Sequence, residues 1–251
     1  AGFLSDTARL AADALMQKPT EGIPISFINL MEWEMIDRLA GEPEGSYKRD
    51  PVPTYRKMLV ASGCCMVDQW IPENPLSMGA SGYRADTPPS ATTGARSVVR
   101  DGIVIDSPEA VADHLERVVF PGLTRGIRAF NEEARADQIV NHEHSVQTVL
   151  GPTMLKVPYG YAAFPKFRYG HYGYENYFMA YALYPELIER DFSLQADLAI
   201  RQNEAFVRAC RNGQLPPFIR LDHDMADSRG TLVDIRSLDR IWFPHFARSL
   251  A

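Results

Sequence analysis

Apolar and polar residues follow two alternating patterns along the chain. Short apolar, β-rich runs predict buried strands at 23–30, 64–71, 154–161 and 218–221. Apolar residues recur at helical spacing over 7–16, 53–61, 108–119, 123–150, 174–209 and 235–250. Strands that alternate with helices predict an α/β fold with a parallel sheet, either a (β/α) barrel or an open doubly wound sheet. We favour the barrel.

The number of predicted strands does not match the length of the chain. An eight-stranded barrel takes about 250 residues, and the chain has 251, yet the pattern predicts only four strands. Either some strands escape the pattern or the barrel is incomplete. Since no linker divides the sequence, we expect one domain over 1–251. A Pro- and Gly-rich insertion around 72–107 has the composition of an active-site loop.

Composition narrows the class of protein. The net charge is −6 and Lys and Arg form no run, which argues against a nucleic-acid partner. No apolar run reaches the roughly 18 residues of a membrane span, and no basic-to-apolar leader opens the chain, so we expect a cytoplasmic protein without a membrane partner. Cys64, Cys65 and Cys210 cannot make a disulfide framework and are expected to be buried reduced thiols.

Polar residues lie in or just after each predicted strand: Asn29, then Asp68 and Gln69, then Tyr159 and Tyr161, then Asp222, His223 and Asp224. Side chains at the carboxyl ends of parallel strands reach one open crevice, so we expect a small-molecule site there. Asp222 and Asp224 share strand parity, and two close carboxylates would form an acid/base or metal-binding pair. The alternative is a loop cap, or pairing with Arg229 or Arg220. His223 alternates to the other face.

Several other features have two interpretations. Asp68 is a charged residue within an apolar strand, which indicates either a functional role or a structural hydrogen bond. Tyr159 and Tyr161 open an aromatic stretch that either lines a pocket or packs in the core. His142 and His144 are two apart rather than three or four, which argues against a helical zinc pair, and we assign no metal ligand. Nothing matches a phosphate loop, a dinucleotide fingerprint or a serine-hydrolase elbow.

Four segments, in order, resemble the uroporphyrinogen decarboxylase superfamily: GIPISFINL, DPVPTYRKMLVASGCCMVD, GYENYFMAYALYPELIERD and LDHDMADSRGTLVDIRSLDRIWFPHFARSL. The last is the most specific, since it is similar to the family's acidic end of the fourth strand, followed by a Gly and a helix that carries Pro. The resemblance implies a (β/α) TIM-type barrel of the uroporphyrinogen decarboxylase type, of which the chain matches the N-terminal part, about four strands. It also places Asp222 and Asp224 at the family's fourth-strand acidic position, and Asp68 near its second-strand acid.

The superfamily includes decarboxylases without a cofactor and corrinoid-dependent methyltransferases that use zinc. Where the decarboxylases carry Arg-Gln-Ala-Gly-Arg-Tyr, this chain has Leu30-Met31-Glu32-Trp33-Glu34. These residues cannot replace guanidinium groups that bind carboxylates, which argues against a porphyrinogen substrate. The methyltransferases take their zinc ligands from a His-x-Cys motif and a later Cys, and both correspond to positions after Ala251. Corrinoid and zinc are therefore implied by the resemblance alone, and no residue of this chain is assigned to them.

We therefore expect a methyltransferase-type enzyme that acts on a one-carbon donor or a corrinoid. The predicted catalytic residues are Asp222, Asp224 and Asp68, and the predicted substrate-binding residues are Asn29, Gln69, Tyr159, Tyr161, His223 and Arg229. One alternative is a decarboxylase of a porphyrinogen-like or other carboxylated substrate. Another is a non-catalytic half-barrel that serves as a binding or assembly subunit. A corrinoid protein is the expected partner, and a second copy or partner chain would cover the sheet edges.

Overall fold

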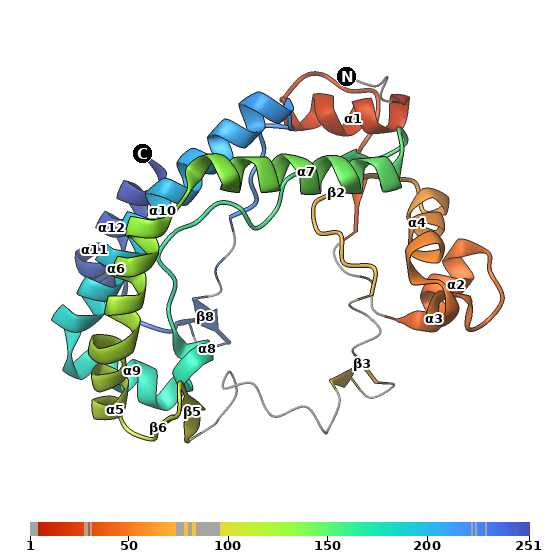
Figure 1. Cartoon of the computed structure of the whole chain (residues 1–251). Coiled ribbons are helices and arrows are strands. Elements are labelled where there is room, and N and C mark those ends of the chain that lie inside the picture. The colour runs from red at the N-terminus through yellow and green to blue at the C-terminus, as the bar shows by residue number, and fades with distance from the viewer. Residues whose placement is uncertain are drawn as a thin grey trace. The chain divides into compact units, whose positions relative to one another are not determined.

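The computed structural model describes residues 5–27, 30, 32–73, 78–79, 82–83, 96–221, 223, 225–228 and 230–251. Contacts divide the chain into two compact units, each assembled from three segments (Figure 1). The first unit comprises Ala1–Asp86, Ala136–Gly160 and Arg208–Arg220, and the second comprises Thr87–Arg135, Tyr161–Val207 and Leu221–Ala251. The single domain expected over 1–251 stays a prediction.

The first unit contains a small parallel sheet. Its strands are β1 (Ile25–Ser26), β2 (Cys64–Val67) and β7 (Leu155–Lys156), in the order β1-β2-β7. Val67 pairs with Lys156, so β2 and β7 end side by side. The unit also holds the β3–β4 hairpin (Met78–Gly79 and Gly82–Tyr83) and the helices α1 (Asp6–Leu15), α2 (Trp33–Ala40), α3 (Ser46–Arg49) and α4 (Pro51–Ala61).

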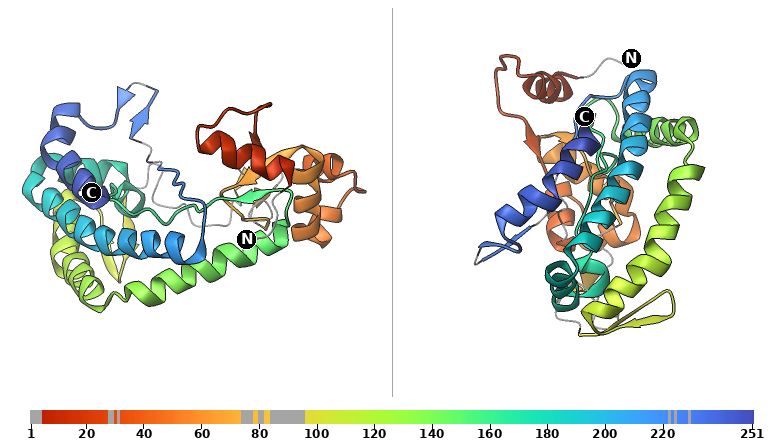
Figure 2. Two further views of the ribbon diagram at one scale, coloured as in Figure 1. Left: turned by 90° about the horizontal axis from the view of Figure 1, so that it is seen from above. Right: turned by 90° about the vertical axis from the view of Figure 1, so that its left-hand side faces the viewer.

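Helices cover both faces of this sheet, as the left view of Figure 2 shows for α1 and α7 (Glu132–Leu150). On one face, Ala8 and Ala11 of α1 pack on Cys65, Leu155 and Val157. On the other face, Met58 and Leu59 of α4 and Val146 and Leu150 of α7 pack on Cys64 and Val67 of β2. A sheet buried on both faces needs apolar residues at consecutive strand positions, which is why these strands read as continuous apolar runs.

The second unit is mostly helical. Its helices are α5 (Pro108–His114), the π-helix η2 (Leu115–Val119), α6 (Phe120–Ala129), α8 (Tyr169–Tyr172), α9 (Tyr174–Leu183), α10 (Pro185–Gly213), α11 (Ile235–Ile241) and α12 (Phe243–Leu250); α7 begins in this unit, and the last turns of α10 belong to the first. Two hairpins accompany them, β5–β6 (Val98–Arg100 and Ile103–Ile105) and β8–β9 (Ala226–Asp227 and Gly230–Thr231). Aromatic side chains dominate the core, including Phe167, Tyr172, Tyr177, Phe192 and Trp242.

The β5–β6 hairpin closes on Asp101 and Gly102, whose φ angles are 52° and 77°. Positive φ at both central residues is the geometry of a tight turn that matches strand twist and favours Asp-Gly. Because a Cβ at Gly102 would meet no atom but would be held in the left-handed region, Gly102→Ala is expected to lower the free energy of unfolding by about 1 kcal/mol. Gly126→Ala, in open space on α6, is expected to raise it by about 1 kcal/mol. Urea unfolding of both variants checks this pair of opposite signs, and a gain for Gly102→Ala would contradict it.

The predicted α/β TIM-type barrel is wrong. The described chain is mostly helical, and its parallel sheet has three strands of two to four residues without closure. Residues 218–221 form no strand: Phe218 N–H donates to the Pro216 carbonyl in a tight turn after two prolines, which lack the N–H that a ladder needs. Strand β7 is short because Pro158, which has no N–H, and Gly160, which has a positive φ, lie soon after it.

Most predicted helices are confirmed, including the break between α9 and α10 at Tyr184-Pro185. The single helix expected over 123–150 is wrong, because Phe130 is extended and separates α6 from α7. The expected helix end at Pro121-Gly122 is wrong, because η2 continues directly into α6 there, with Pro121 in the first turn, where its missing N–H costs nothing. Helix α2 was not expected from the pattern. None of the described helices is long and apolar enough to cross a membrane.

Candidate functional site

Asp68 lies at the carboxyl end of the parallel sheet in the first unit, directly after β2. Its side chain is buried. Oδ1 accepts from the Gln69 N–H at 2.6 Å, and Oδ2 pairs with Arg220 Nη1 at 2.9 Å. The Asp68 carboxylate therefore has structural partners. It also lies at the end of a strand, where side chains of parallel sheets reach a ligand.

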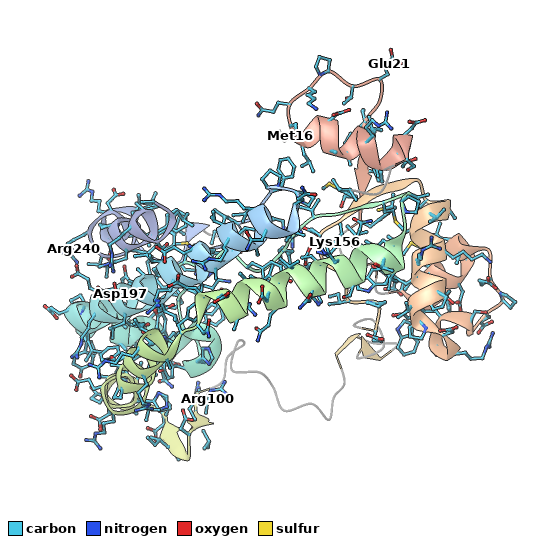
Figure 3. The ribbon with its side chains drawn as sticks, turned by 45° about the horizontal axis from the view of Figure 1, so that its top comes forward. Met16, Glu21, Arg100, Lys156, Asp197 and Arg240 are labelled. Carbon is cyan, nitrogen blue, oxygen red and sulfur yellow. The ribbon has the colours of Figure 1, made fainter. Side chains whose placement is uncertain are left out.

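Lys156, the last residue of β7, lies beside α7 (Figure 3) and pairs with Val67, the residue before Asp68. Its ammonium donates to three acceptors: the Asp68 carbonyl at 2.9 Å, Glu143 Oε2 at 2.9 Å and the Val157 carbonyl at 2.7 Å. The side chains of Lys156 and Glu143 are only 4% and 2% exposed. Burial lowers the pKa of Lys156, and the charges of Glu143 and Asp68 oppose that shift. A buried lysine needs such a set of partners.

Arg220 and Tyr159 complete this edge of the sheet. The Arg220 guanidinium lies over the Tyr159 ring, 4.2 Å from its centroid, while it pairs with Asp68. A cation on an aromatic face is stabilised by the electrons of the ring. Of the predicted site residues, Asp68, Gln69 and Tyr159 thus belong to one constellation, which we call the Asp68 site and which also contains Arg220, Lys156 and Glu143.

An acidic hollow lies at the start of α2 in the first unit. Glu32 precedes α2 and Glu34 lies in its first turn. They line an open hollow of about 820 Å³ together with Met35, Asp37, Arg38, Glu42 and Glu44. The lining has five carboxylates and one guanidinium, and Glu42 also pairs with Lys57, so the hollow is predominantly anionic.

The remaining predicted site residues fall into two groups. Tyr161 and His223 belong to the second unit. Tyr161 stacks on Phe206 there, and His223 stacks on Phe167 and accepts the Phe167 N–H through Nε2 at 3.2 Å. Asn29, Asp222, Asp224 and Arg229 lie outside the described residues. The predicted carboxylate pair at 222 and 224 therefore stays a prediction, and the described partner of Arg220 is Asp68.

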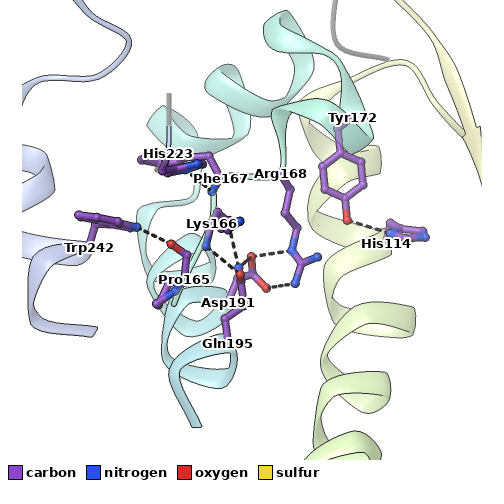
Figure 4. A network of polar contacts seen from close by, with 10 residues as sticks. All are labelled: His114, Pro165, Lys166, Phe167, Arg168, Tyr172, Asp191, Gln195, His223 and Trp242. Atoms are coloured by element: carbon purple, nitrogen blue, oxygen red, sulfur yellow. Dashed lines mark hydrogen bonds and ion pairs between the residues drawn. The ribbon is translucent and has the colours of Figure 1, made fainter. Parts of the chain in front are cut away.

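The second unit contains a buried polar network around Asp191 (Figure 4). Arg168 binds both carboxylate oxygens, with Nε–Oδ2 at 2.7 Å and Nη2–Oδ1 at 2.9 Å, and Gln195 donates to Oδ2 at 2.7 Å. Gln195 also bonds the backbone of Lys166 in both directions. These contacts fasten the segment before α8 to α10. We interpret the network as structural, because Asp191 has no exposed surface.

The aromatic stretch after Tyr159 packs mainly in the core of the second unit, which favours the packing interpretation over a pocket lining. Burial raises the pKa of several tyrosine hydroxyls in the two units: Tyr47, Tyr55, Tyr172, Tyr177 and Tyr181.

These tyrosines predict the response of stability to alkaline pH. An unfolded tyrosine loses its proton near pH 10, whereas the folded one keeps it, so the folded state binds more protons above that pH. The free energy of unfolding is therefore expected to be insensitive to these groups below about pH 10 and to fall steeply above it. Urea unfolding at rising pH measures the slope. Tyr177→Phe should make it shallower, and Tyr174→Phe, at an exposed position, is the control. A flat profile through this range would contradict the prediction.

The described residues do not fit a zinc ion. Among them, no three His, Cys, Asp or Glu side chains gather into a set that could hold a metal. Burial raises the pKa of Cys64, and burial together with Glu143 raises the pKa of Cys210 to about 11. At neutral pH these groups are thiols rather than the thiolates that bind zinc, and we derive no step through a metal.

The sequence interpretation missed Lys156 and Glu143. Lys156 lies in an apolar run that predicted a strand, and the reasoning that singled out Asp68 as a buried charge applies equally to it. Glu143 was considered only within the His-Glu-His segment, although it shares an α7 face with the buried Val146 and Leu150.

Comparison with models of known families, with curated proteins and with solved structures finds no match to this chain.

Proposed function

We propose that this chain acts as a uroporphyrinogen decarboxylase-like enzyme of the methyl-transfer type, with the Asp68 site as its reaction site. The observation that carries the proposal is the position of Asp68 at the carboxyl end of β2, beside Tyr159 and Arg220. The resemblance of 50–68 to the family's second-strand segment ends on this same residue. The expected carboxylates at 222 and 224 follow Arg220 by two and four residues.

In the proposed reaction a methyl group moves from a one-carbon donor, such as a methylated corrinoid, to a nucleophile such as a thiol. The sulfur–carbon bond forms as the donor–carbon bond breaks, and both electrons of the broken bond stay on the donor. The thiol proton passes to a base, and Asp68 is the carboxylate offered for it. Tyr159, with Arg220 over its ring, adds an aromatic side chain beside which a flat donor would bind.

The acidic hollow supports methyl transfer over decarboxylation of a porphyrinogen. On the resemblance, Glu32 and Glu34 correspond to the arginine motif of the decarboxylases, and the hollow they line is predominantly anionic. A substrate with many carboxylates would meet like charge there. The second candidate, a decarboxylase of a smaller carboxylated substrate, is favoured by one observation: Arg220 at the Asp68 site is a guanidinium that could bind a single carboxylate.

The two candidates differ in what the purified protein consumes. Methylcobalamin with a small thiol reports methyl transfer through the absorbance of the cobalt–carbon bond, and uroporphyrinogen reports decarboxylation through release of carbon dioxide. We expect thiol-dependent loss of methylcobalamin and no carbon dioxide from uroporphyrinogen. Carbon dioxide release from uroporphyrinogen without a corrinoid would overturn the methyl-transfer proposal in favour of a decarboxylase, and inactivity with methylcobalamin and thiol would count against methyl transfer.

A further inference from the structure

Lys156 joins three elements of the first unit at one atom. Its ammonium reaches the carbonyl of Asp68, which follows β2, the carbonyl of Val157, which follows β7, and the carboxylate of Glu143 on α7. An ammonium has three N–H donors, and each has an acceptor within 2.9 Å. The carboxyl ends of two parallel strands are therefore fixed to each other and to the helix that covers them.

Other contacts of α7 make this arrangement specific. Gln147 lies one turn after Glu143. Its side-chain oxygen accepts the backbone N–H of Lys156 at 2.8 Å, and its amide nitrogen donates to the Met154 carbonyl at 2.9 Å. The backbone on both sides of Leu155 is thus held by the same helix. The Asp68 backbone is held by Lys156, and its carboxylate by the Gln69 N–H and by Arg220.

We propose that Lys156 is a positioning residue, which sets the direction of the Asp68 carboxylate by holding the Asp68 carbonyl. This inference rests on the proposed function of the Asp68 site. Lys156 itself is too buried to touch a substrate. A misplacement of about 1 Å can cost on the order of 100-fold in rate, so a group that fixes the backbone of a reacting residue matters even without substrate contact.

A double variant distinguishes a positioning role of Lys156 from a purely structural one. Lys156→Met with Glu143→Leu replaces the ion pair by apolar side chains of similar volume, a change that generally preserves stability, but it removes the N–H that holds the Asp68 carbonyl. Three measurements on the whole chain suffice: urea unfolding, kcat and KM with methylcobalamin and a small thiol, and the amide resonance of Gln69 in ¹⁵N-glutamine-labelled protein. Lys18→Met with Asp13→Leu removes an exposed ion pair and is the matched control.

We expect the double variant to keep most of the parent's free energy of unfolding, to lose on the order of 100-fold in kcat with little change in KM, and to show a displaced Gln69 resonance. The control should keep all three values. If the double variant keeps the parent kcat, the inference is overturned while the proposed function stands. If the parent itself has no activity, the proposed function fails, and the Gln69 resonance decides the inference: an unmoved resonance overturns it, and a displaced one supports a positioning role.

Discussion

Lys156→Met is expected to lower the free energy of unfolding by about 3–5 kcal/mol, because it leaves the carboxylate of Glu143 buried without its countercharge. The carbonyls of Asp68 and Val157 lose a donor in the same step. Urea unfolding measures the loss. For comparison, Lys18→Met breaks an exposed pair whose lysine side chain is 60% exposed, and it should cost less than about 1 kcal/mol.

The double variant used for the positioning test also tests the cause of this loss. When Lys156→Met is combined with Glu143→Leu, no buried charge is left alone, so most of the stability should return. A single variant as stable as the parent would contradict the buried pair. A double variant as unstable as the single one would show that the lost donor to the Asp68 and Val157 carbonyls, rather than the uncompensated charge, is responsible.

Arg168→Met is expected to destabilise the chain by about 3–5 kcal/mol as well, through the network around Asp191 in the second unit. Asp191 has no exposed surface, and Arg168 supplies both of its ionic contacts, leaving only the Gln195 amide after the change. Bidentate pairing of this kind is geometrically specific, so Arg168→Lys should recover only part of the loss.

The matched control for Arg168 is Arg248, which binds Asp197 in an exposed ion pair. Arg248→Met should change the free energy of unfolding by less than about 1 kcal/mol. Thermal unfolding followed by circular dichroism compares the two arginine variants. Equal effects at Arg168 and Arg248 would contradict the role assigned to the Asp191 network.

The helices could be predicted because their apolar spacing and breaks are local. The segment 7–16 repeats apolar residues every three or four positions, and Tyr184-Pro185 breaks the next helical stretch where α9 ends. The Asp101-Gly102 turn carries an equally local signal, which was overlooked inside the Pro- and Gly-rich insertion. Sheet closure is not local, and the alternation of strands and helices around β1, β2 and β7 could not distinguish a barrel from a three-stranded sheet.

The candidate site was predicted in part, for a similar reason. The position of Asp68 at a strand end follows from the sequence, because the strand and the residue after it are adjacent. Its partners come from distant segments: Lys156 is 88 positions away, and the contact joins two strands whose pairing no local pattern encodes. Arg220 was considered only as an alternative partner for a carboxylate at 222 or 224, and no local pattern indicated its ion pair with Asp68.

If Asp68 carries the chemistry of this chain, as we propose, Asp68→Asn should abolish most of the activity. The substitution keeps an oxygen acceptor for the Gln69 N–H but removes the base. With methylcobalamin and a small thiol, we predict a rate about 100- to 10,000-fold below that of the parent, with the helical circular dichroism unchanged, while Asp13→Asn keeps the parent rate. An Asp68→Asn protein that transfers the methyl group at the parent rate would contradict the claim.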